Sequence, residues 1–153
     1  MSQVEQRLAQ MGITLAPSAA PVANYVHYVI TGHQIFVSGQ LPMKDGKPLA
    51  SGQVGTHCTI EEAQAAARQC GINMLAHLKE ACGGNLDRIK RCVKLGVFVN
   101  SGATFTDHPK VANGVSDFIV EVFGDAGKHT RAAVGVSQLP FNVAVEVDGI
   151  FEI

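Results

Sequence analysis

The stretch Thr59-Ile-Glu-Glu-Ala-Gln-Ala-Ala-Ala-Arg-Gln-Cys-Gly-Ile-Asn-Met-Leu-Ala-His-Leu-Lys-Glu-Ala-Cys-Gly-Gly84 decides how the rest of the chain can fold. Thr59 and Glu62 have the spacing of a capping box, which starts a helix, and the two glycines end it. Apolar side chains recur between them at helical spacing, at Ala63, Ala67, Cys70, Met74, Leu75 and Leu78. A long helix with one apolar face requires a second layer of structure to cover that face.

The segment before this helix predicts a β-hairpin. Two β-rich runs, 25–31 and 34–39, flank Gly32 and His33, a two-residue connection suited to a tight turn. Upstream, Ser2 and Glu5 again form a capping-box pattern, which predicts a short N-terminal helix.

An extended connector is expected over residues 16–23, where two prolines and several alanines show no periodicity. We therefore treat residues 1–23 as an N-terminal helix and connector attached to the rest of the fold.

The segment after the long helix predicts further strands around a second helix. We expect, in chain order, a strand over 89–99, an insertion over 101–106, a helix from Asp107 to Gly124, and strands over 131–136 and 143–153. The central part of this order is β-β-α-β-α-β.

These elements predict one α+β domain over residues 1–153, with two layers. The sheet is mixed and largely antiparallel, and both long helices cover one of its faces. Its other face stays uncovered in one copy. Because an exposed apolar face is normally hidden by association, we expect a homo-oligomer.

The composition excludes several classes of protein. Lys and Arg total 12 against 13 Asp and Glu, and no basic stripe could follow a nucleic-acid backbone. No apolar run is long enough to span a membrane, and we expect a cytoplasmic protein. The four cysteines and six histidines show no metal-binding spacing, so we expect no metal.

Arg131 is the most isolated cation of the sequence, because the Ala-Ala-Val-Gly-Val that follows it is uncharged. A guanidinium on a rigid strand can hold a small carboxylate through two parallel hydrogen bonds. The alternative is a solvated arginine at a strand end.

Glu146 lies in the alternating run Val143-Ala144-Val145-Glu146-Val147-Asp148. The valines share one face, and Glu146 takes the opposite face with Ala144 and Asp148. A half-buried carboxylate could exchange protons with a water molecule. The alternative is a solvated carboxylate on an exposed sheet face.

Tyr25 and Ser38 bracket the predicted hairpin and offer hydroxyl groups, and Asn113 lies on the second helix. Each also has a purely structural interpretation, namely strand-edge packing for Tyr25, a turn hydrogen bond for Ser38, and capping or solvation for Asn113.

Read together, these residues resemble the RidA (YjgF) family. Tyr25-Val26 followed by Ile35-Phe36-Val37-Ser38-Gly39-Gln40-Leu41-Pro42 is similar to the opening hairpin of the family. Arg131, Leu139-Pro140 and Val145-Glu146-Val147 reproduce its closing pattern without a gap.

The resemblance implies a chorismate-mutase-like trimer with its pocket between subunits, and a deaminase that hydrolyses enamines or imines such as 2-aminoacrylate to 2-oxo acids without a cofactor. It implies that Arg131 holds the substrate carboxylate and that Glu146 activates water. Tyr25, Ser38, Gly39 and Asn113 would line the pocket, together with the backbone of Ala133, which stands where typical members have cysteine.

Two other functions stay open. The chain could be a regulatory protein that binds a small carboxylate without catalysis. It could instead be an endoribonuclease or translation inhibitor, the older description of the family, although its near-neutral charge argues against RNA binding.

Overall fold

The computed structural model describes residues 1–153 and contains three α-helices, seven strands and three short 3-10 helices. In chain order these are α1 (Gln3–Gln10), β1 (Tyr28–Thr31), β2 (Gln34–Gln40), β3 (Met43–Lys44), β4 (Lys47–Pro48), α2 (Ile60–Ala81), η1 (Leu86–Arg88), β5 (Arg91–Asn100), α3 (His108–Phe123), η2 (Gly124–Gly127), β6 (Thr130–Val136), η3 (Pro140–Asn142) and β7 (Val145–Glu152).

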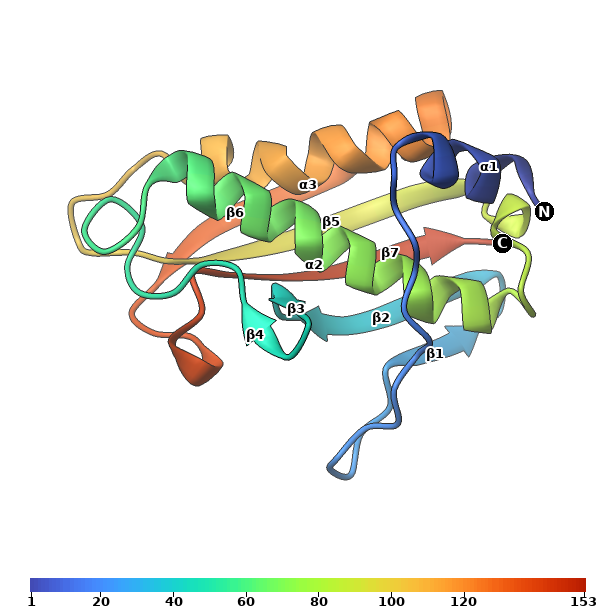
Figure 1. Ribbon diagram of the computed structural model, residues 1–153, viewed down its shortest axis with the longest axis horizontal. Helices are drawn as coiled ribbons and strands as arrows, with labels where there is room; N and C mark the ends of the chain where they lie inside the picture. Colours follow the sequence, from blue (N-terminus) through green and yellow to red (C-terminus); the bar gives the residue numbers. More distant parts are fainter.

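Five strands form one sheet in the order β1-β2-β7-β5-β6. Only β5 and β6 run parallel, and the other neighbours are antiparallel. Figure 1 shows α2 and α3 side by side on one face of this sheet, whereas β3 and β4 form a separate small ribbon. The predicted two-layer α+β fold with a mixed sheet is confirmed.

The core lies between the sheet and the two long helices. Along β7 the residues Val145, Val147 and Phe151 are fully buried and alternate with partly buried residues, because every second residue of the strand faces the core. Gly114 lets α3 approach α2 closely, because a Cβ at this position would stand 2.2 Å from the backbone oxygen of Gln64.

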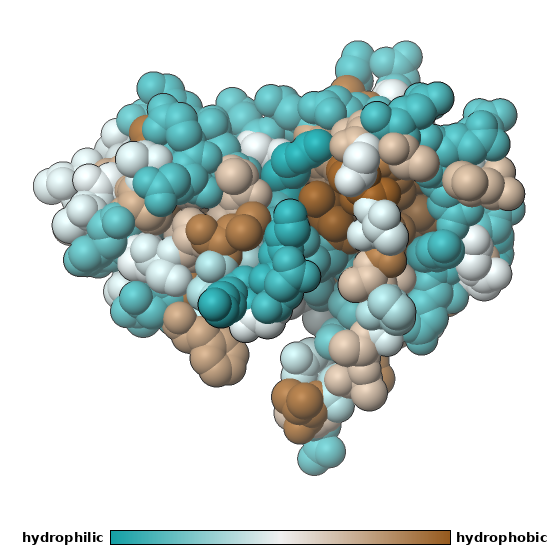
Figure 2. All heavy atoms as spheres, viewed as in Figure 1, coloured by the Kyte–Doolittle hydropathy of each residue, from teal (hydrophilic) through white to brown (hydrophobic).

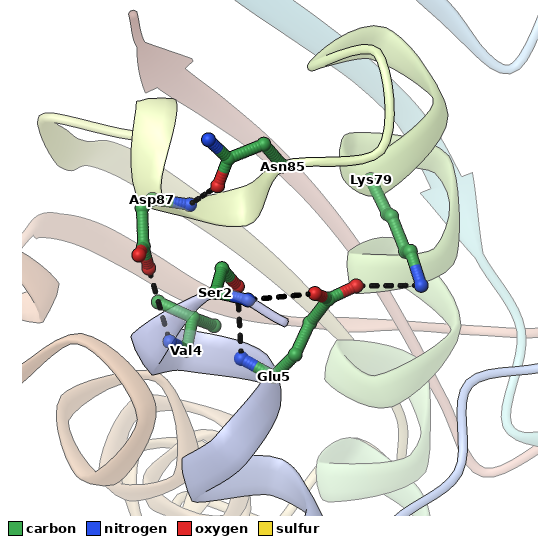
Figure 3. Close-up of polar contacts among 6 residues, drawn as sticks. All are labelled: Ser2, Val4, Glu5, Lys79, Asn85 and Asp87. Atoms are coloured by element: carbon green, nitrogen blue, oxygen red, sulfur yellow. Dashed lines mark hydrogen bonds and ion pairs between the residues drawn. The ribbon is translucent and has the colours of Figure 1, made fainter.

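The N-terminal helix α1 is tied to the end of α2 and to η1 (Figure 3). Ser2 and Glu5 form the predicted capping box. The carboxylate of Asp87 accepts hydrogen bonds from the backbone amides of Gln3 at 2.8 Å and Val4 at 3.0 Å. Glu5 also pairs with Lys79 of α2 at 2.6 Å.

The face of the sheet opposite the helices is uncovered and partly apolar. Val29, Phe36 and Val134 are 51%, 41% and 46% exposed, and the strand registers place Phe98 and Ile150 on the same face. The expectation of one uncovered face is therefore confirmed for a single copy.

Some predicted boundaries were wrong. Both predicted C-terminal strands are present, at Thr130–Val136 and Val145–Glu152, so the complete main order is β-β-α-β-α-β-β. The first strand begins at Tyr28 and leaves Tyr25 outside it, ahead of a bend at His27. The third predicted strand begins at Arg91, because the backbone first makes a 3-10 turn capped by the side chain of Asn85.

No helix is both long and apolar enough to cross a membrane.

Candidate functional site

Arg131 lies on the edge strand β6 and faces the helix layer. Its register partner Leu95 on β5 is fully buried beneath the helices. The Nη1 atom of Arg131 donates to Asn113 Oδ1 at 2.9 Å and to Ser116 Oγ at 3.1 Å. Because Nη1 carries two hydrogens, both are used, and the Nε and Nη2 edge of the guanidinium is left to bind a ligand.

Glu146 lies on β7 and points to the uncovered face. It alternates with the buried Val145 and Val147 as predicted, while Ala144 is buried in a bend that precedes β7. Burial raises the pKa of the Glu146 carboxyl, and the nearby carboxylate of Asp148 raises it further. A raised pKa makes the Glu146 carboxyl better suited to exchange protons near neutral pH.

Gly39 on β2 provides the space that the Glu146 carboxylate occupies. A Cβ added to Gly39 would stand 2.9 Å from Oε1 of Glu146. Its neighbour Ser38 donates its hydroxyl hydrogen to the backbone oxygen of Val26 at 2.6 Å. The Ser38 oxygen therefore keeps only lone pairs to offer, and can accept a hydrogen bond from a ligand.

Tyr25 stands at the rim of a cavity of about 500 Å³ between the hairpin and α2. Its side chain is half-exposed, and its ring meets the His27 ring edge-on with the centroids 6.2 Å apart. Gly39, Gln40 and His77 also line this cavity.

A chain of hydrogen bonds runs through His77 from the N-terminal connector to the hairpin. The ring nitrogens of His77 are 2.8 Å from Ser18 Oγ and 3.2 Å from Gln40 Oε1, and Gln40 Nε2 donates to the Ser38 backbone oxygen at 2.9 Å. The Gln40 oxygen must then accept, so His77 donates through Nε2. The sequence interpretation did not include this chain.

The predicted site residues fall into two groups. Asn113, Arg131 and Ala133 form what we call the arginine half-site. We call Glu146, Gly39, the neighbouring Ser38 and Tyr25 the glutamate half-site, because Gly39 adjoins the Glu146 carboxylate and lines the same cavity as Tyr25.

The strand register separates the two half-sites within one copy. Arg131 pairs with Leu95, whereas Glu146 pairs with Phe98, three residues further along the same strand β5. Successive residues of a strand point to opposite faces, so an odd separation places the two side chains on opposite faces of the sheet. Ala133, opposite Val97, shares the face of Arg131.

The sequence interpretation missed Ser116 and His129 next to Arg131. Ser116 follows Asn113 by three residues on α3, and residues three apart share one face of a helix. His129 precedes Arg131 by two residues, immediately before β6. These two spacings were the available signals.

No group of three or more His, Cys, Asp and Glu side chains is arranged to hold a metal ion. The four cysteines are buried free thiols. Burial raises the pKa of Cys92 to about 12, and the desolvated Cys70 thiol also has a pKa well above its usual value. These thiols are therefore poor nucleophiles.

Comparisons with known proteins identify the family. The family model described as "YjgF/chorismate mutase-like, putative endoribonuclease" matches residues 5–152. The chain is 51% identical to Protein TCP17 of Trypanosoma cruzi, over 99% of this chain and 94% of that protein. It is 30% identical to the 2-iminobutanoate/2-iminopropanoate deaminase of Dermatophagoides farinae, over 89% of each.

Among solved structures, a "putative endoribonuclease" of Shewanella oneidensis superposes with a TM-score of 0.92 at 39% identity, covering 98% of this chain and 99% of that one. The chain belongs to the YjgF (RidA) family, as the sequence resemblance predicted.

Proposed function

We propose that this protein hydrolyses 2-imino acids, and the enamines that tautomerise to them, to 2-oxo acids and ammonia. The observation that carries the proposal is the free Nε and Nη2 edge of Arg131, an anion-binding group whose other nitrogen is already fixed by α3. The named activity of the mite relative supports the same reaction class.

Arg131 binds the substrate carboxylate. A carboxylate that meets the Nε and Nη2 edge makes two parallel charge-assisted hydrogen bonds, which fix its plane as well as its position. The imine carbon is bonded directly to the carboxylate carbon, so this contact also fixes the imine carbon for attack.

Glu146 acts as the general base. Its pKa is raised by burial and by Asp148, which makes the carboxylate a better proton acceptor than an exposed glutamate. The carboxylate takes one proton from water while the water oxygen bonds to the imine carbon. The nitrogen receives that proton together with the electron pair of the carbon–nitrogen double bond, which gives a carbinolamine. Glu146 then takes the hydroxyl proton and delivers it to the nitrogen as the carbon–nitrogen bond breaks, so that the carbonyl forms and ammonia leaves with all three hydrogens.

The other members of the glutamate half-site serve binding. Ser38 Oγ has lone pairs available and accepts a hydrogen bond from the imine N–H. Gly39 leaves the Glu146 carboxylate free to approach the substrate. In the arginine half-site, Ala133 has no thiol, so only its backbone contributes.

We further propose that the working form is a homotrimer in which the arginine half-site of one copy meets the glutamate half-site of its neighbour. One copy cannot place Arg131 and Glu146 around the same small substrate, because they lie on opposite sheet faces. The uncovered apolar face, with Phe36 and Val134 exposed, supplies the surface on which copies associate.

The test measures ammonia and 2-oxo acid released from freshly generated 2-aminoacrylate and 2-aminocrotonate. We expect turnover by the wild type and its loss in Arg131→Ala and Glu146→Gln. Saturable 2-oxobutanoate binding without turnover would contradict the deaminase function and indicate a carboxylate-binding protein. RNA cleavage that survives purification and is lost in both variants would instead indicate a ribonuclease.

A further inference from the structure

Behind Arg131, Ser116 and His129 form further hydrogen bonds that the proposed reaction does not itself require. Nδ1 of His129 is 2.6 Å from the backbone oxygen of Gly127, and Nε2 of His129 is 2.8 Å from Ser116 Oγ. Ser116 Oγ in turn accepts from Arg131 Nη1 at 3.1 Å. The residues lie on α3, η2 and the start of β6, so the chain of contacts joins three elements.

The direction of every bond in this chain follows from its end. The Gly127 carbonyl oxygen can only accept, so His129 donates through Nδ1. In a neutral imidazole Nε2 is then the acceptor, and the Ser116 hydroxyl donates to it. With its hydrogen committed to His129, the Ser116 oxygen is oriented to accept from Arg131. Along this chain, from the Gly127 oxygen to Nη1 of Arg131, every donated hydrogen has one acceptor.

This arrangement fixes the rotation of the guanidinium. Asn113 Oδ1 and Ser116 Oγ take both hydrogens of Nη1. A long arginine side chain on an exposed edge strand would otherwise sample several rotamers, which costs binding energy when one is selected. The free edge is therefore held in one orientation before a ligand arrives.

We propose that Ser116 and His129 are positioning residues that hold Arg131 with its Nε and Nη2 edge presented to the substrate carboxylate. This inference rests on the proposed role of Arg131. If these hydrogen bonds were purely structural, they would only attach β6 to α3. Their loss would then lower the stability of the protein and leave the ligand affinity of the folded protein unchanged.

The variants separate the hydrogen-bond roles. Ser116→Ala removes the acceptor for Arg131, and Ser116→Thr keeps a hydroxyl. His129→Asn can still donate to Gly127 but has no acceptor at the position of Nε2, whereas His129→Gln places a carboxamide oxygen near that position. His33→Asn, at the exposed hairpin turn, is the control.

The experiment measures the dissociation constant of 2-oxobutanoate by calorimetry, KM and kcat for imine hydrolysis, and the unfolding midpoint of each variant. We expect Ser116→Ala and His129→Asn to raise the dissociation constant and KM about five- to tenfold with kcat changed less than about twofold. Ser116→Thr and His129→Gln should recover most of the affinity.

A second measurement follows the rotation of the Arg131 guanidinium by side-chain nitrogen NMR without any ligand. Ser116→Ala should make this rotation faster. The positioning role is overturned if Arg131→Ala abolishes 2-oxobutanoate binding while Ser116→Ala and His129→Asn bind it like the wild type. If Arg131→Ala itself leaves binding unchanged, the proposed function fails, and unchanged guanidinium rotation in Ser116→Ala would then overturn the positioning role separately.

Discussion

Arg131 and Glu146 lie on opposite faces of the same sheet, because their partners Leu95 and Phe98 are an odd number of residues apart on β5. Both side chains are needed by the proposed reaction. The geometry therefore connects catalysis to association, and a change that separates the copies should abolish activity without touching either residue.

Gly39→Ala tests whether activity depends on the close approach of the Glu146 carboxylate to Gly39. The added Cβ would stand 2.9 Å from Oε1 and 3.0 Å from Cδ of Glu146, so the carboxylate must move. We expect imine hydrolysis to fall at least about tenfold, because misplacing a catalytic group is costly, while the unfolding free energy changes by less than about 1 kcal/mol. Gly102→Ala is the control, since its Cβ would meet only the Gln53 side chain at 3.7 Å. Equal activity in both variants would exclude Glu146 as the base.

Val134→Lys tests the uncovered sheet face. Val134 is 46% exposed on the face that we propose to be covered by other copies, and burying a lysine charge there is unfavourable. Sedimentation should show smaller species than the wild type, together with loss of turnover. Val22→Lys, 98% exposed on the connector that projects at the bottom of Figures 1 and 2, should leave assembly unchanged. Assembly of Val134→Lys at wild-type size would contradict the proposed interface.

His77 should make the protein less stable in mild acid. Burial lowers its pKa from 6.5 to about 4, with a further contribution from His27, while Glu80 opposes the change. As the pH falls, His77 is therefore protonated in the unfolded chain before it is protonated in the folded one. The stability that comes from keeping His77 neutral is fully present above about pH 6.5 and declines as the pH falls towards 4. A tenfold change in proton affinity corresponds to about 1.4 kcal/mol, and solvent screening limits the total loss to roughly 2 kcal/mol.

Denaturant titrations of the wild type and His77→Gln between pH 7 and pH 4 isolate this contribution. The pKa values of Glu146 and Asp148 are raised, so these groups act in the opposite direction in both proteins and cancel in the comparison. We expect the difference in unfolding free energy between the wild type and His77→Gln to become smaller as the pH falls. Parallel curves for the two proteins would show that His77 is protonated equally in the folded and unfolded states.

Asp87→Ala should loosen the N-terminal helix. The Asp87 carboxylate accepts from two amides in the first turn of α1, which otherwise have no helical partner, and Figure 3 shows the contact with Val4. We expect a loss of about 1–2 kcal/mol and faster amide exchange in α1. Asp125→Ala, which removes only a surface ion pair with Lys128, should change the stability by less than about 0.5 kcal/mol. Similar losses in both variants would contradict this role of Asp87.

Most of the fold could be predicted from the sequence because its signals are local. The capping boxes at Ser2 and Thr59 and the apolar periodicity of α2 and α3 depend only on neighbouring residues, and both capping boxes are present. The start of the first strand was less predictable. Tyr25 and Val26 have high β propensity, but the bend before Tyr28 leaves them outside the ladder.

The site was predicted as a set of residues but not as a geometry. The residue types and spacings near Arg131 and Glu146 indicated the chemistry, whereas the division into two half-sites depends on the register of β5 against β6 and β7, which no local pattern encodes. Ser116 and His129 were missed for the same reason, since their meeting requires α3 to pack over the start of β6. The cytoplasmic location stays a prediction.

The most direct test of the shared site mixes two inactive variants. Arg131→Ala and Glu146→Gln are unfolded together at equal concentrations and refolded, so that their copies assemble at random. A site built from Arg131 of one copy and Glu146 of the next has both native residues in about one case in four, and the mixture should recover about a quarter of wild-type imine hydrolysis. Activity no higher than that of the two variants refolded separately, with mixed assemblies demonstrated by mass spectrometry, would contradict a site shared between copies.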